Sequence, residues 1–300
     1  MEYLKTVIIQ EVTVAADGTY SWDLPVNPVS HLVLTIMCLN LTDEATIYDI
    51  ADMVPNVHVL HRGTTVLQMR ARDLLALNHL LLRKTPVIGP QVADDTYVRW
   101  LSLIIPFGRD MYRPDECFPE SKAGELTIQL TCDILTAECT GLILQLESVE
   151  LMGATPAKHL KCTTLISTPT ALGDWDIDLP INNNYAALML RAHTKPLAAA
   201  WTCTIEALKL LADNVEHYVG YTNWESLQGE MINRPGMEPG FIAAHGYQHW
   251  AHYAYIDFDP RLNDTFLMPT AGLSSLKLRI DAGAMDEIRV FPIELPAAPR

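Results

Sequence analysis

The chain has 300 residues, of which 49% are hydrophobic, and its 36 acidic and 21 basic residues give a net charge of −15. The hydrophobic fraction excludes a disordered chain, and the acidic balance argues against direct nucleic-acid binding, because phosphate contacts need clustered Lys and Arg. No apolar run approaches the roughly 18 residues of a membrane-spanning helix. The first five residues lead into a predicted strand, so we expect no signal peptide here.

The six cysteines show no metal-binding or redox spacing. No CxxC motif occurs, and most of the cysteines lie inside apolar runs, which is typical of buried free thiols that act as small apolar residues. We therefore expect synthesis in a reducing cytoplasm, with no structural disulfides. The residues are Cys38, Cys117, Cys132, Cys139, Cys162 and Cys203.

A stretch of ten residues occurs twice in the chain. Residues 18–27 are GTYSWDLPVN and residues 173–182 are GDWDIDLPIN, and the copies align without a gap at a shift of 155 residues. A second similar pair follows, since AGELTIQLTCD at 123–133 returns as AGLSSLKLRID at 271–281. Several matches in the same order indicate a duplication. We predict two domains with one strand order, at 1–151 and 158–300, joined by a linker at 152–157.

In the first half, short runs rich in β-branched residues alternate with turn signals, which is typical of strands. Leucines at helical spacing predict one helix over 73–82, capped by Asp73 and ended by Pro86. The polar and acidic stretch 40–55 is predicted to be a loop. The predicted strands lie at 6–14, 20–24, 31–39, 56–61, 64–69, 96–105, 126–133 and 142–151.

The second half repeats this order. A short helix is predicted at 224–231, a turn at Asp213-Asn214 joins two strands, and 233–250 is predicted to be a long loop. Alternation in both halves predicts six side chains that face a core, namely Leu126, Ile128, Leu130, Leu276, Leu278 and Ile280. The predicted strands lie at 160–167, 174–179, 185–192, 201–210, 215–221, 253–258, 276–281 and 288–295.

About eight short strands per half, separated by turn signals, predict a sandwich architecture. Eight strands in two sheets make a jelly roll. The sequence therefore predicts an all-β fold of two tandem eight-stranded jelly rolls, each with one short helix after the sixth strand.

Two tandem rolls, each with a helix, resemble the double jelly-roll major capsid proteins of tailless icosahedral viruses. That lineage includes membrane-containing bacteriophages and adenovirus-type viruses. The stretches RGTTVL at 62–67, RDLLALN at 72–78 and IPFGRDMY at 105–112 are similar to phage members. The resemblance covers essentially the whole chain and rests on architecture and repeat order, because this family has no catalytic signature. The second half departs from it in the longer loop at 233–250.

The resemblance implies a structural function without enzymatic activity. Three copies around a threefold axis would present six rolls and tile an icosahedral shell like a hexagon. It further implies a place in the virion after synthesis in the host cytoplasm, contacts with penton and minor capsid proteins, and no direct contact with nucleic acid. Whether a membrane lies beneath the shell stays open. The candidates for outward loops or subunit contacts are 40–55, 84–95 and 233–250.

Three histidines are the nearest approach to a metal cluster: His245, His249 and His252. On a helix their spacing would gather them around zinc, but Gly246 weakens a helix, so loop and strand-edge histidines are the simpler interpretation. A two-domain cupin enzyme is one alternative to a capsid protein. His58 and His61 would be its metal ligands, yet their H-x-x-H spacing points them to opposite faces of a strand. We therefore predict no catalytic residues and no cofactor.

Loop carboxylates offer a second kind of metal site. Asp43 and Glu44, and likewise Asp94 and Asp95, are solvated by default, and the alternative is a calcium ion held at subunit contacts. A lectin- or spike-like binding module is a third functional class. Its binding aromatics would be Trp224, Tyr247 and Trp250.

Overall fold

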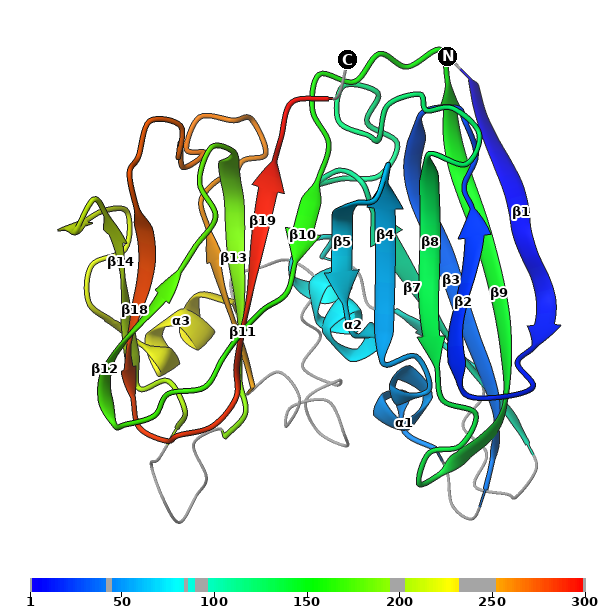
Figure 1. Ribbon diagram of the computed structural model, residues 1–300, viewed down its shortest axis with the longest axis horizontal. Helices are drawn as coiled ribbons and strands as arrows, with labels where there is room; N and C mark the ends of the chain where they lie inside the picture. Colours follow the sequence, from blue (N-terminus) through cyan, green and yellow to red (C-terminus); the bar gives the residue numbers. More distant parts are fainter. Residues whose placement is uncertain are drawn as a thin grey trace. The chain divides into compact units, whose positions relative to one another are not determined.

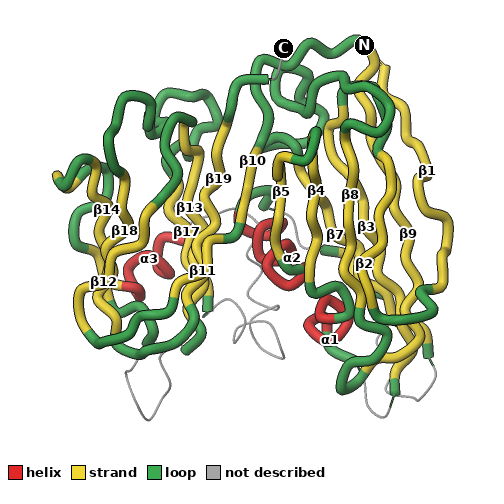
Figure 2. The backbone as a smooth tube through the Cα atoms, viewed as in Figure 1, coloured by secondary structure: helices red, strands yellow, loops and turns green. Residues whose placement is uncertain are grey.

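The computed structural model describes residues 2–41, 45–83, 86–89, 97–194, 203–231 and 252–298 (Figure 1). The chain divides into two compact units, Met1–Cys162 together with Ala297–Arg300, and Thr163–Pro296. Strands dominate both units (Figure 2). The described residues contain three short helices, α1 (Ile47–Asp52), α2 (Ala71–Leu80) and α3 (Trp224–Met231), none of them long and apolar enough to cross a membrane.

The first unit is built from two antiparallel sheets. One sheet has the order β1 (Glu2–Thr13), β9 (Cys139–Met152), β3 (Val29–Asn40), β7 (Val98–Pro106) and β6 (Val87–Ile88). The other contains, side by side, β2 (Gly18–Asp23), β8 (Leu126–Cys132), β4 (Asn56–His61) and β5 (Thr64–Met69). In Figure 1 the second sheet lies in front of the first, with α1 and α2 near the lower ends of β4 and β5.

The second unit has the same construction with shorter strands. One sheet places β19 (Ile288–Leu295) between β13 (Asn184–Ala192) and β11 (Leu165–Ser167), with β17 (Tyr253–Asp257) beyond β13. The other contains β12 (Gly173–Asp178), β18 (Leu276–Ala282), β14 (Ala207–Ala212) and β15 (Val215–Glu216), and β16 (Thr222–Asn223) also pairs with β14. Strand β10 (Lys161–Thr163) lies where the chain passes from one unit to the next.

The two units share one strand order, as the repeat predicts. The order β1-β9-β3-β7 corresponds to β11-β19-β13-β17, and β2-β8-β4-β5 corresponds to β12-β18-β14-β15. The register is also duplicated, because Gly18 pairs with Cys132 in the first unit and Gly173 pairs with Ala282 in the second. The common order confirms the duplication. The domain boundaries at 151 and 158 stay a prediction. The two compact units divide the chain slightly differently, because residues 158–162 and 297–300 belong to the first unit.

The alternating pattern in β8 and β18 fills both cores. All six side chains predicted to face inward are at most 2% exposed: Leu126, Ile128, Leu130, Leu276, Leu278 and Ile280. Period-two alternation puts every second side chain of a strand into the sandwich, so this prediction is confirmed. The turn at Asp213-Asn214 is confirmed as well, since both residues have positive φ and join β14 to β15.

Three predictions about helices need correction. The stretch 40–55 is not all loop, because α1 begins after Thr46, which forms a capping box with Asp49 and lets Ile50 be buried. Asp73 does not cap α2, which begins at Ala71; instead Asp73 lies in the first turn with its side chain buried. Finally, α2 follows the fifth strand, because a single hairpin, β4–β5, precedes it.

Candidate functional site

The residues predicted as metal ligands do not form a cluster where the structure describes them. His252 lies at the start of β17, where its Nδ1 is 3.0 Å from the carbonyl oxygen of Ala192. Across the described ranges, no group of three or more His, Cys, Asp and Glu side chains is placed to hold a metal ion. The other candidates lie outside the described residues, namely His245, His249, Asp43, Glu44, Asp94 and Asp95.

The residues predicted for a cupin metal site or for a binding module make structural contacts within the protein. The His58 ring is 2.9 Å from the Thr65 hydroxyl on the neighbouring strand, and His61 packs edge-on against Phe118 with ring centroids 5.2 Å apart. Trp224 is fully buried in the core of the second unit, so it cannot bind a surface ligand. The prediction of Trp224 as a binding aromatic is wrong, because α3 turns this ring into the sandwich. Tyr247 and Trp250 lie outside the described residues.

A buried ion pair holds the segment that follows β7, within the motif IPFGRDMY. The Arg109 side chain donates to Glu116, with Nη2–Oε2 at 2.6 Å and Nε–Oε1 at 2.9 Å, and the Arg109 amide donates to Oε1 at 2.7 Å. Both side chains are almost fully buried, and the Lys158 ammonium lies 3.7 Å from Glu116. Burial alone would raise the pKa of Glu116, but the hydrogen bonds and charge of Arg109 outweigh it, so this pKa lies below its usual range.

Gly108 fits where no larger residue would. A Cβ at Gly108 would lie 2.3 Å from the backbone oxygen of Glu116. Close approach of two backbone segments is a position that requires glycine. The glycine of the motif therefore allows the segment to fold back onto Glu116.

Gly108→Ala is expected to destabilise the protein by about 2–4 kcal/mol, because either the backbone shifts or the Arg109–Glu116 pair is distorted. Urea unfolding at neutral pH measures the change. Gly229→Ala is the matched control, since a Cβ there meets nothing within 4 Å and alanine favours the helix α3. Equal stability of the Gly108→Ala variant and the wild-type protein would contradict this role.

A carboxylate held by an asparagine occurs in both units. In the first, Asn27 donates to Glu150 at 2.7 Å, and the Thr6 hydroxyl donates to the other carboxylate oxygen at 2.6 Å. In the second, Asn183 donates to Glu294 at 2.6 Å. Both glutamates are buried in the last strand of their unit. The pair ties the end of the repeated motif, or the residue after it, to the closing strand. Sequence reasoning missed it, because 123 and 111 positions separate the partners.

The hydrogen bond of the asparagine also shows that the ungapped alignment of the two repeats is one residue out of register at this point. The sequence aligns Asn27 with Asn182, whereas the structure gives the same hydrogen bond to Asn183. The isolated bridges Val29–Phe118 and Tyr185–Met268 confirm a shift that is one residue larger after the motif. Asn182 takes a positive φ of 88°, which accommodates the extra residue in the turn.

Two histidines of the first unit are buried. His31 contacts Tyr112, and His159 contacts Phe118, with ring centroids 5.2 and 5.1 Å apart. Burial lowers the pKa of His31 to about 4, with a smaller contribution from Lys5. Burial likewise lowers the pKa of His159 to about 4. Both imidazoles are therefore neutral in the folded protein at neutral pH.

Acid is expected to destabilise the first unit. The folded pKa of each histidine lies below the unfolded value, so their contribution is complete above about pH 6.5 and is lost as the pH falls toward 4, on the order of 3 kcal/mol per group. Urea unfolding between pH 7.5 and 4.5 measures the loss. His159→Gln is expected to reduce the slope of the free energy of unfolding against pH by the contribution of about one bound proton. An unchanged slope in this variant would contradict the assignment.

Strand β1 is a long, exposed sheet edge. Among the described strands it ends its sheet and pairs only with β9, so one side of its backbone faces away from the sheet. In Figure 1 it lies beside β9 at the margin of the unit. Four large apolar side chains, which we call the β1 edge, are 43–66% exposed: Tyr3, Leu4, Val7 and Val12. Long apolar edges of this kind pair with other chains unless they are protected.

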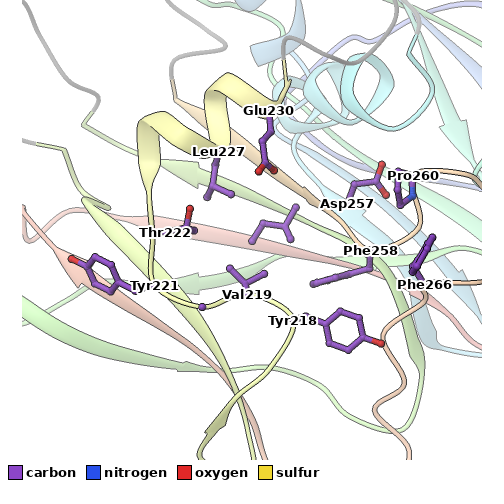
Figure 3. A pocket seen from close by; sticks show the side chains of 12 residues that line it. Tyr218, Val219, Tyr221, Thr222, Leu227, Glu230, Asp257, Phe258, Pro260 and Phe266 are labelled. Atoms are coloured by element: carbon purple, nitrogen blue, oxygen red, sulfur yellow. The ribbon is translucent and has the colours of Figure 1, made fainter.

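The second unit carries an aromatic hollow of about 550 Å³ between α3, β17 and the segment 218–222 (Figure 3). Tyr218, Tyr221 and Phe266 line it and are about half to two-thirds exposed. Glu230 and Asp257 add carboxylates to its wall, and Figure 3 shows both above the aromatic rings. Aromatic faces beside carboxylates suit apolar or cationic side chains. The geometry therefore favours a contact surface over a catalytic pocket.

Comparison with known proteins decides the fold. No protein-family model and no curated protein matches the sequence. Solved structures match over nearly the whole chain. One is a chain in the atomic structure of Sulfolobus Turreted Icosahedral Virus, with a TM-score of 0.73 at 11% identity, covering 98% of this chain and 91% of that one. The fold is a double jelly roll.

Two further structures agree with this fold. The major capsid protein of bacteriophage PM2 gives a TM-score of 0.68 at 14% identity, covering 100% of this chain and 99% of that chain. The Faustovirus major capsid protein gives 0.61 at 7% identity, covering 99% and 90%. These matches confirm the predicted fold class, two jelly rolls in tandem, because each of them covers both halves of the chain.

Proposed function

We propose that this chain is the major capsid protein of an icosahedral virus and that it assembles as a trimer. The observation that carries the proposal is the whole-chain likeness to capsid proteins, since the matches to two major capsid proteins cover 99–100% of this chain. The matching strand order of the two units supports it, because two similar modules per chain let three chains fill a six-sided position.

The described surface is consistent with self-association. The β1 edge exposes apolar side chains that a monomer would not need, and the aromatic hollow offers a second apolar surface. Stable obligate interfaces commonly bury about 2,000 Å² or more, so trimer contacts along the flanks of the rolls would cover such surfaces. The net charge of −15 supports an indirect contact with the genome, through another component of the virion.

The proposal includes no enzymatic activity and places penton and minor capsid proteins among the partners. Calcium at subunit contacts, held by Asp43, Glu44, Asp94 or Asp95, stays a prediction. The binding-module alternative is not favoured, because Trp224, its one candidate aromatic among the described residues, is buried. The cupin alternative is not favoured either, since His58 and His61 have different partners.

Sedimentation of the purified chain at micromolar concentration tests the proposal. Three copies of the 33.5 kDa chain would sediment as a particle of about 100 kDa, or as a larger shell. Electron microscopy of the same sample should show six-lobed particles. A chelator is expected to alter the assembly only if calcium bridges the subunits. A stable monomer at tens of micromolar would overturn the proposed function.

A further inference from the structure

Two cysteines on neighbouring strands of the first unit lie against each other. The Sγ atoms of Cys38 on β3 and Cys139 on β9 are 3.1 Å apart, although 101 positions separate them in the chain. Both side chains are buried, at 1% and 0% exposure, and both thiols are free. We propose that Cys38 and Cys139 are an oxidative modification site, at which a disulfide forms when the protein leaves a reducing environment.

A β-bulge brings the two sulfurs together. Met37 pairs with Ile143 and Leu39 with Thr140, so β9 has one residue more than β3 across this interval. Gly141 lies in the bulge with φ of +69°. Bulges re-aim the side chains beside them. Cys139 pairs with Asn40, so Cys38 lies diagonally across from it on the same face of the sheet. An S–S bond is about 2.05 Å long, so sulfurs that are 3.1 Å apart must approach by about 1 Å.

The surroundings favour reaction at Cys139. The Cys38 thiol donates to the Cys139 sulfur, and this hydrogen bond lowers the pKa of Cys139 and raises that of Cys38. Arg99, the β7 residue opposite Cys38, is buried beside the pair, and its charge favours the thiolate form of both. A thiolate next to a guanidinium is the attacking form in thiol–disulfide exchange.

Oxidised glutathione, or another small disulfide, supplies the oxidant. The Cys139 thiolate attacks one glutathione sulfur and releases the first glutathione as a thiolate, which leaves a mixed disulfide on Cys139. Cys38 then gives its proton to solvent and attacks the Cys139 sulfur, releasing the second glutathione. One small disulfide is reduced to two thiols, and the two cysteines are oxidised to one bond.

The turn before β9 offers a route for the reagent. Cys139 closes this turn through two hydrogen bonds, from the Thr136 amide to the Cys139 carbonyl at 2.9 Å and from the Cys139 amide to the Thr136 hydroxyl at 3.2 Å. Leu135, which precedes the turn and bridges to Thr140, is 60% exposed. The Leu41 amide also donates to the Glu138 carbonyl at 3.0 Å, and Cys139 pairs with Asn40. Local opening of this end of β9 breaks these contacts and exposes Cys139, while the rest of the sheet stays paired.

The bond would lock the first roll by joining β3 to β9 across a long loop of chain. This consequence for a virus rests on the proposed function: a shell leaving the reducing host cytoplasm would gain the bond after release. Formation of the bond itself does not depend on assembly. A failure of trimerisation and a failure of oxidation therefore give separate results.

The test treats the folded full-length chain with oxidised glutathione, then unfolds and alkylates it. We expect a loss of about 2 Da, two fewer alkylated thiols, one Cys38–Cys139 crosslinked peptide, and a melting temperature higher by about 10 °C that falls back with reductant. Cys38→Ser and Cys139→Ser should each abolish these changes. Cys132→Ser, which removes another buried thiol, should keep them.

The wild-type protein alone can overturn the proposal, whatever the folding of the variants. Six alkylated thiols after oxidation and unfolding would do so, as would a bond that joins any other pair of cysteines. An unchanged melting temperature in the bonded protein would overturn the locking role. Sedimentation of the oxidised and reduced samples side by side records assembly independently.

Discussion

Arg109→Met is expected to lower the free energy of unfolding by about 3–5 kcal/mol. The substitution keeps most of the side-chain volume but removes the three hydrogen bonds that Nε and Nη2 of Arg109 donate to Glu116, which is fully buried and loses its main partner. An uncompensated buried charge is far more costly than the loss of an ion pair at the surface. Urea unfolding of the reduced protein at pH 7.5 measures the difference.

Two controls separate the buried charge from lost packing. Arg109→Met combined with Glu116→Leu should recover most of the loss, because both charges then leave the interior together. Arg62→Met removes the partner of Glu125 at the surface, where the pair is 3.0 Å long but Arg62 is 56% exposed, and should cost less than about 1 kcal/mol. A double variant as unstable as Arg109→Met would show that packing, and not charge, is responsible.

Sequence patterns predicted the parts of the fold that depend on local periodicity. Alternation in β8 and β18 is visible in single strands, so Ile128 and Leu278 could be placed in the cores without knowledge of their neighbours. The repeated motif carries the pairing of β2 with β8 into the second unit residue for residue. Fold class and strand order follow from these two signals.

Contacts between segments that are distant in the sequence leave no periodic or repeated pattern from which they could be predicted. Glu150 and Glu294 are buried because an asparagine from another loop reaches each of them, and a one-residue offset hides the second asparagine from an ungapped alignment. Cys38 and Cys139 meet through a bulge that depends on pairing between β3 and β9. Helix α1 was missed because its polar residues, among them the capping Thr46, suggested a loop.

The β1 edge is expected to carry a trimer contact, so that charges introduced there should dissociate the trimer. Leu4→Asp combined with Val7→Asp puts two carboxylates on an apolar strand edge, and burying them in an interface without partners is unfavourable. A loss of about 3 kcal/mol corresponds to an increase of more than 100-fold in the dissociation constant. Sedimentation across a concentration series measures this shift.

The roll itself should tolerate the same substitutions, because both side chains are about half exposed and β1 keeps its backbone pairing with β9. An unchanged melting temperature of the dissociated chain under reducing conditions would show this. Met285→Asp is the matched control, since Met285 is a 57% exposed apolar residue outside the β1 edge. If Met285→Asp dissociated the trimer equally, added charge alone would explain the effect. A trimer that withstands both charges on β1 would place the contact on another surface, because no subunit interface can bury two unpaired carboxylates without a measurable loss of affinity.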